Sequence, residues 1–176
     1  MALSHWKIDP GRSRLTFTVR HLVVTRVHGT FHRWGGEAEI DVDDLSRGRV
    51  EVALEVESVD TGDRARDDNL RSADFFDAQN FPQLRFRSTR VTPKGRNRLL
   101  LEGELEMRGV TRPVALQAEL RGKQTDSSGV NRLSFALETA IHRKQWRLEW
   151  SQALEVGGAL VSDQVQINGQ VEFVGG

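Results

Sequence analysis

The feature that most constrains how this chain folds is a regular alternation of apolar and polar residues. Long runs in which almost every second residue is apolar occupy residues 50–57, 99–108, 114–121 and 164–173. Shorter or less regular runs occupy residues 15–19, 38–42, 84–86 and 133–137. Because successive side chains of a strand point to opposite faces, a period of two predicts strands with one apolar face and one face in water.

Turns rich in glycine, proline and serine separate these runs. They lie at residues 9–11, 35–36, 47–48, 93–95, 127–129 and 157–158. Eight or nine strands at this spacing predict an antiparallel barrel or sandwich. A closed barrel of about eight strands holds its own side chains or one slender ligand. Gly103 and Gly169 lie on the apolar faces, where a small residue either leaves room or permits a bend, and the pattern does not separate these two roles.

Composition excludes several kinds of protein. The 25 Lys+Arg and 25 Asp+Glu residues give a net charge of zero, which argues against a broadly basic nucleic-acid binder. The chain has no cysteine, so disulfides and thiol catalysis are excluded, and no apolar run approaches the roughly 18 residues of a membrane span. No linker or repeat divides the chain, so we expect one domain over residues 1–176. The opening MALSHW lacks the basic and apolar regions of a secretion signal, and we therefore expect a cytoplasmic location.

Two stretches depart from the alternation. In residues 61–80, TGDRARDDNLRSADFFDAQN, Asp63 is expected to cap a short helix that runs through Arg71. Phe75 and Phe76 follow that helix, and in an extended segment they would point in opposite directions, so only one of them is expected to face the channel. Residues 142–150, HRKQWRLEW, join two strand regions. In an all-β protein both stretches are expected to cover the open ends.

Several motifs then occur in order along nearly the whole chain. They are WKID at residues 6–9, SRLTFTVRH at 13–21, VHGTF at 27–31, RDDNLRSADFFDAQNFPQLRFRST at 66–89 and GELEMRGVTRPV at 103–114. In this order the motifs resemble the YceI-like family, most specifically over residues 66–89. The resemblance implies an all-β fold, an antiparallel eight-stranded lipocalin-like β-barrel with one or two short helices covering the openings.

The resemblance also implies non-catalytic binding, with transport or storage, of an isoprenoid lipid or prenylated quinone in the barrel channel. No cofactor, metal or catalytic residue is expected. The candidate channel residues are Phe17, Val19, Phe31, Leu54, Phe76, Phe86, Leu105, Phe135 and Trp146. The alternative for each of them is a place in an ordinary hydrophobic core.

The candidate contacts for a polar head group are Arg66, Asp67, Asn69 and Arg143. The alternative is structural: Arg66, Asp67 and Asn69 then cap the helix and fix it to the rim, and Arg143 meets a rim carboxylate. The chain departs from the family pattern near these positions. Arg12 stands where a histidine is usual, Asn69 replaces another histidine, and residues 142–147 lack the usual asparagine and glycine. Because these changes fall in loops near the openings, they bear on which ligand is bound.

Three other interpretations compete with lipid binding. His28 and His32 share one face of a strand, but that face is expected to point to solvent, so no metal site is predicted. A terpenoid- or quinone-modifying enzyme would use rim carboxylates, for which Asp67, Asp68, Asp74 and Asp77 are the candidates. A packed interaction barrel without ligand is the third interpretation. Residues 22–24, LVV, are apolar on both faces and would suit a homodimer contact.

Overall fold

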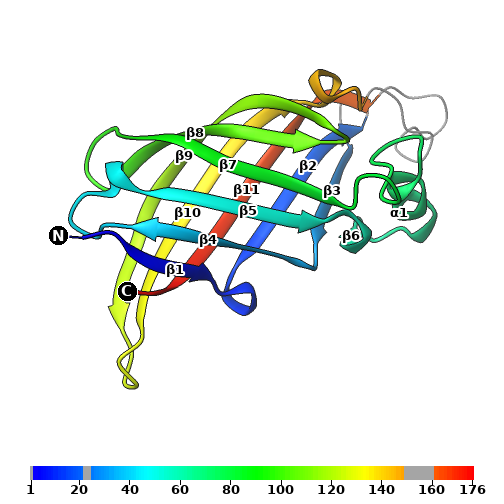
Figure 1. The fold of residues 1–176 in the computed structure, drawn as a ribbon. Coiled ribbons are helices and arrows are strands. Elements are labelled where there is room, and N and C mark those ends of the chain that lie inside the picture. The colour runs from blue at the N-terminus through cyan, green and yellow to red at the C-terminus, as the bar shows by residue number, and fades with distance from the viewer. Residues whose placement is uncertain (1, 22–24, 149–160) are drawn as a thin grey trace.

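Hydrogen-bonded strands account for most of the computed structural model, which describes residues 2–21, 25–148 and 161–176. Within those ranges one antiparallel sheet has the order β1-β4-β5-β7-β8-β9-β10-β11-β2-β3-β6, and β1 also pairs with β11 (Figure 1). The strands are β1 (Ser4–Ile8), β2 (Arg14–His21), β3 (Thr25–Phe31), β4 (Trp34–Ile40), β5 (Arg49–Glu55), β6 (Val59–Asp60), β7 (Gln83–Pro93), β8 (Arg98–Met107), β9 (Val110–Thr125), β10 (Asn131–His142) and β11 (Val161–Gly175).

The strands close into a barrel because three pairs of consecutive strands each act as one interrupted barrel strand. The 3₁₀ helix Pro10–Arg12 separates β1 from β2, two residues separate β3 from β4, and the 3₁₀ helix Val56–Ser58 separates β5 from β6. Each of the resulting eight strands pairs with its neighbour in the chain, and β11 closes the ring against both β1 and β2. The predicted antiparallel eight-stranded barrel is therefore confirmed.

One α-helix lies between β6 and β7. It is α1 (Arg64–Arg71), and the Asp63 carboxylate accepts a hydrogen bond from the N–H of Arg66 at 3.0 Å, which confirms the predicted cap. The 3₁₀ helix Arg143–Trp146 lies at the same end of the barrel, which we call the helix end (Figure 1). The chain termini lie at the opposite end, which we call the terminal end. No helix in the described ranges is long and apolar enough to cross a membrane.

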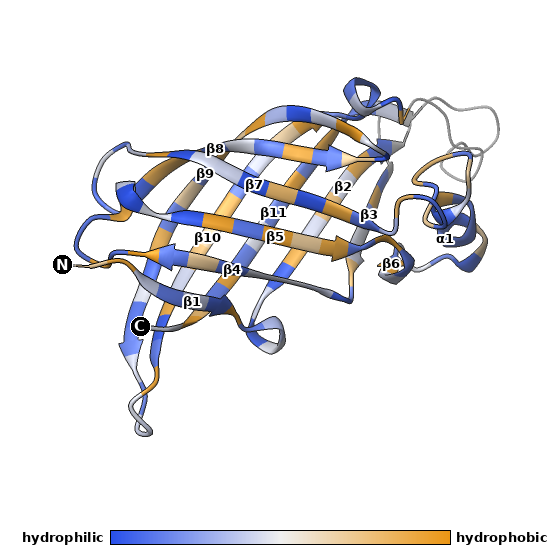
Figure 2. Ribbon diagram, viewed as in Figure 1, coloured by the Kyte–Doolittle hydropathy of each residue, from blue (hydrophilic) through white to orange (hydrophobic). Residues whose placement is uncertain are grey.

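The alternation in the sequence becomes the two faces of the barrel wall. Figure 2 shows apolar and polar residues alternating along the long strands. On the outer face, oppositely charged residues stand across from one another, as in the pairing of Arg87 with Glu104, whose side chains approach to 3.3 Å. On the inner face, Leu133 is 1% exposed, and Leu137 and Phe135 follow it along β10.

The two glycines on the apolar faces serve close packing. A Cβ atom at Gly103 would lie 2.4 Å from the backbone oxygen of Arg87 and 2.6 Å from Cζ of Phe86, and one at Gly169 would lie 2.6 Å from Cδ2 of Leu15. All three distances are shorter than real contacts of a Cβ atom. At both positions the small residue makes room for a neighbouring side chain, and opposite Gly103 the register of β7 and β8 also shifts, between Ser88 and Arg90.

Candidate functional site

A cavity of about 280 Å³ lies inside the barrel. All eight barrel strands contribute lining residues, and α1 contributes Leu70. The lining is apolar except for Thr16, Arg49, Thr139 and Arg143. Such a cavity is close in size to the smaller pockets that hold organic ligands, which start at about 300 Å³.

The middle of the barrel is hollow because its inward side chains do not meet across the axis. Phe17, Leu54, Leu105 and Leu137 line the cavity, yet each is only half-buried. An inward-facing side chain in a filled core would lose almost all its accessible surface. These residues instead keep part of their surface accessible from inside the barrel. The arrangement therefore differs from the fully packed barrel that the sequence left open.

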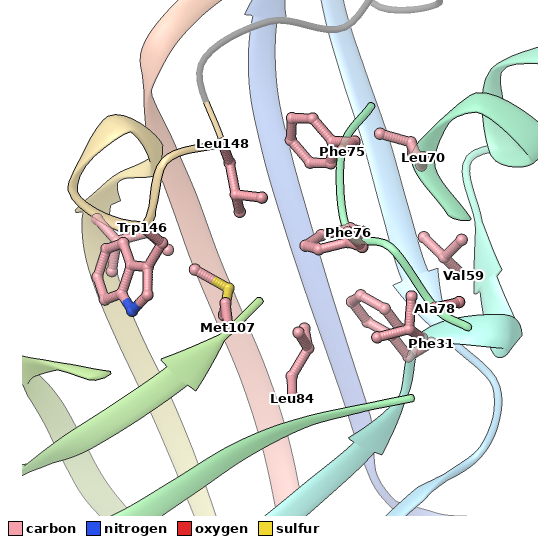
Figure 3. Packing of buried hydrophobic residues seen from close by; sticks show 12 residues of the cluster. Phe31, Val59, Leu70, Phe75, Phe76, Ala78, Leu84, Met107, Trp146 and Leu148 are labelled. Atoms are coloured by element: carbon pink, nitrogen blue, oxygen red, sulfur yellow. The ribbon is translucent and has the colours of Figure 1, made fainter. Parts of the chain in front are cut away.

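The helix end of the cavity is filled by a buried cluster that Figure 3 shows. Its aromatic rings touch edge to face, with centroids 4.8 Å apart for Phe75 and Phe76 and 6.2 Å apart for Phe31 and Phe76. Leu70 of α1 and Leu148, which follows the 3₁₀ helix, point into the same cluster (Figure 3). The two non-strand stretches thus supply the side chains that cover this end.

The terminal end is filled on one side. Trp6, Ile8, Leu133 and Phe173 belong to a second buried cluster, which comes from β1, β4, β10 and β11. On the other side, the cavity is lined by side chains of β5, β7 and β8 that are not fully buried. These residues are Arg49, Val50, Val91 and Leu99.

Eight of the nine predicted channel residues line the cavity. They are Phe17, Val19, Phe31, Leu54, Phe76, Phe86, Leu105 and Phe135. Trp146 does not line it: the side chain is 1% exposed in the helix-end cluster, and its indole N–H donates to the carbonyl oxygen of Leu105 at 2.8 Å. Trp146 thus anchors the 3₁₀ helix to β8.

Sequence reasoning missed several lining residues. Phe75 lines the cavity together with Phe76, because residues 73–76 form turns and not an extended segment, so the expectation that only one of them faces the channel was wrong. Thr139 also lines it, and its hydroxyl donates to the carbonyl oxygen of Ala115 at 2.6 Å. The period of two along β10 contained the signal for Thr139, because this residue continues the inward series after Leu137.

The structure separates the four head-group candidates. Arg143 lines the cavity and is 6% exposed. Its guanidinium donates to the carbonyl oxygens of Leu148 at 2.6 Å and Ser162 at 3.1 Å. These two bonds tie the side chain to the segment after the 3₁₀ helix and to β11. Arg143 therefore brings a buried cation to the helix end of an apolar cavity.

The other three head-group candidates lie outside the cavity lining. Arg66 donates to the hydroxyl and carbonyl oxygens of Thr61 at 2.8 and 2.9 Å. The buried Asp67 carboxylate accepts from the N–H and the hydroxyl of Thr61 at 2.9 and 2.6 Å. The carbonyl oxygen of Asn69 accepts from the N–H and the hydroxyl of Ser72. These bonds join α1 to the chain on either side of it.

The metal interpretation receives no support from the described part of the chain. There, no three His, Cys, Asp or Glu residues are grouped to hold an ion. His28 and His32 are exposed on the outer face, where they contact the Thr18 hydroxyl at 2.9 Å and the Asp60 carboxylate at 2.7 Å. The hydrogen bond from His32 is the main cause that lowers the pKa of Asp60, followed by the bond from the Gly62 N–H.

The rim carboxylates proposed for an enzyme face other groups. Asp68 pairs with Arg71 at 2.7 Å, and Asp77 accepts from the Asn80 side chain at 2.9 Å. Neither these two residues nor Asp67 and Asp74 belong to the cavity lining. The expected dimer contact at residues 22–24 lies outside the described residues.

Comparison with known proteins agrees with this geometry. The YceI-like domain matches residues 6–173 of the chain. Protein YceI of Salmonella newport is 37% identical over 147 residues, which cover 82% of this chain and 76% of that protein. The crystal structure of BcnA from Burkholderia cenocepacia has a TM-score of 0.82 at 21% identity and covers 94% of this chain and 98% of its own. A polyisoprenoid-binding domain from Saccharophagus degradans, implicated in plant cell wall breakdown, has a TM-score of 0.73 at 13% identity and covers 97% and 98%. Both solved structures share the fold.

Proposed function

The chain belongs to the YceI-like family, and on this basis we propose that it binds an isoprenoid lipid or prenylated quinone in its barrel channel without catalysing a reaction on it. The observation that carries the proposal is the hollow, apolar interior of about 280 Å³. A solved domain of the same fold is described as polyisoprenoid-binding, which supports the same ligand class. Carriage or storage of the lipid is the role that such binding would serve.

The energetics favour a chain of several isoprene units. Burial of apolar carbon contributes about 0.8 kcal/mol per CH₂ group, or roughly 4 kcal/mol gross for a five-carbon unit. Association costs about 4–15 kcal/mol in lost freedom, so a few units offset it. The tail therefore supplies affinity, and the polar end supplies selectivity.

Arg143 is the proposed contact for that polar end. Its buried guanidinium lines the cavity, and its positive charge would attract a carbonyl, hydroxyl or phosphate oxygen of a head group. Arg143→Met should weaken binding of a prenylated quinone about ten-fold while changing binding of a prenyl hydrocarbon much less. An equal loss of affinity for both ligands would show that Arg143 does not contact the head group.

The alternative functions are a terpenoid- or quinone-modifying enzyme and a packed interaction barrel. The position of the rim carboxylates outside the cavity lining favours binding over the enzyme. If the pure protein turned over prenyl or quinone substrates and Asp67→Asn abolished that turnover, the enzyme would be favoured over binding. The hollow interior favours a ligand over the packed barrel.

Solvent extraction of freshly purified protein, followed by mass spectrometry, tests the proposal directly. We expect an isoprenoid lipid or prenylated quinone in the extract, and stoichiometric rebinding of a prenyl chain added to stripped protein. Recovery of no lipid together with no rebinding would rule the proposal out. A homodimer and a cytoplasmic location stay predictions from the sequence, which light scattering and cell fractionation can check.

A further inference from the structure

Gly29 of β3 is covered by the ring of Phe17 from the neighbouring strand. The two residues are direct cross-strand partners of β2 and β3. A Cβ atom built on Gly29 would lie 2.2 Å from Cζ of Phe17 and 2.7 Å from both of its Cε atoms. The ring therefore lies flat across the backbone of Gly29, in the space that any larger residue at position 29 would need.

This packing keeps the Phe17 ring against the barrel wall. Phe17 lines the channel and is half-buried, while Gly29 is buried beneath it. Beside it, the Phe31 ring packs against the Phe17 ring, with centroids 5.7 Å apart and planes tilted by 46°. Because the wall lies behind the ring and Phe31 lies beside it, a ring displaced from Gly29 has to move toward the channel axis.

A Cβ atom at Gly29 would clash with the side chain of its cross-strand partner Phe17, and in this respect Gly29 differs from Gly103. The three atoms nearest to a Cβ at Gly29 all belong to the Phe17 ring, whereas the nearest atom at Gly103 is the backbone oxygen of Arg87 at 2.4 Å. Gly29 also has no positive φ, so its backbone accepts an alanine. A methyl group at position 29 thus acts mainly by moving one ring.

We propose that the pair of Gly29 and Phe17 sets the bore of the channel and so selects the cross-section of the chain that enters it. This inference rests on the proposed function. A prenyl chain carries a methyl branch in every isoprene unit and is wider than a linear acyl chain. With the ring against the wall, the channel admits the branched chain; with the ring turned inward, it admits only the thinner, linear one.

Binding of geranylgeraniol and of a linear alcohol with the same carbon number tests the proposal. Gly29→Ala should weaken binding of geranylgeraniol by at least about ten-fold, because the displaced ring overpacks the channel, and should change binding of the linear alcohol far less. The double variant Gly29→Ala/Phe17→Leu should restore geranylgeraniol binding, because the smaller leucine clears the new methyl group. Gly35→Ala is the matched control, since a Cβ there meets nothing within 4 Å.

Each other outcome contradicts the inference. Equal weakening for the two alcohols in Gly29→Ala, or no recovery in the double variant, overturns the selection of cross-section by this pair. If Gly29→Ala is too unstable to purify, the single variant Phe17→Leu tests the inference. It widens the bore, so the affinity for geranylgeraniol should rise relative to the affinity for the linear alcohol. An unchanged ratio overturns the inference. Wild-type protein that binds neither alcohol shows instead that the proposed function is wrong, and the inference falls with it.

Discussion

A hydroxyl group placed in the channel wall should weaken prenyl binding without a change of shape. Val165 on β11 lines the channel, is half-buried and stands between Val19 of β2 and Ile141 of β10. Val165→Thr keeps the volume of the side chain and adds one hydroxyl facing the interior. In the empty channel water can satisfy that hydroxyl, whereas a bound prenyl chain displaces the water and offers no partner.

The magnitude follows from the cost of burying an unsatisfied hydroxyl, about 1–3 kcal/mol in proteins. Since 1.4 kcal/mol corresponds to a factor of ten, we expect the Kd for farnesol to rise about five- to 150-fold. Isothermal titration of stripped protein with farnesol measures this change. Val174→Thr is the control on the same strand, because Val174 lies outside the channel lining. A change for Val165→Thr no larger than that for the control would refute the location of the ligand along β11.

Three further predictions concern stability. Leu133→Ala should lower the free energy of unfolding by about 2–5 kcal/mol in urea denaturation, because Leu133 is 1% exposed within the terminal-end cluster. Asp63→Ala should lower it by about 1 kcal/mol through loss of the cap on α1, whereas Asp63→Asn should cost less. Hydrogen bonds from the Ser128 hydroxyl, then from the Val130 N–H, lower the pKa of Asp126 from 3.8 to about 2. This carboxylate therefore stabilises the fold above pH 4 and loses that contribution as the pH falls toward 2, so Asp126→Asn should flatten the dependence of stability on pH in that window. An unchanged acid limb in the variant would contradict the assignment.

Local patterns in the sequence predicted the strands and the helix cap. Leu133 and Leu137 both point inward because every second side chain of a strand lies on the same face. This rule needs no knowledge of the rest of the fold. Asp63 acts on an N–H three residues away, so its role was also visible locally. The place of Trp146 could not be predicted in this way. A large aromatic side chain suits a channel wall, but the indole N–H of Trp146 donates to the carbonyl oxygen of Leu105, 41 residues away in the chain.

The sequence by itself determined which face of each strand is apolar, and the resemblance of its motifs indicated a barrel. Tertiary structure alone decided that the apolar faces leave a cavity, because an empty volume depends on how far side chains from all eight barrel strands reach toward one axis. It also placed Arg143 at the cavity and turned Arg66 toward Thr61, although both are arginines near a predicted rim. The contact of the Phe17 ring with Gly29 joins two neighbouring strands and depends on their register. That register is fixed jointly by the turns and by closure of the barrel.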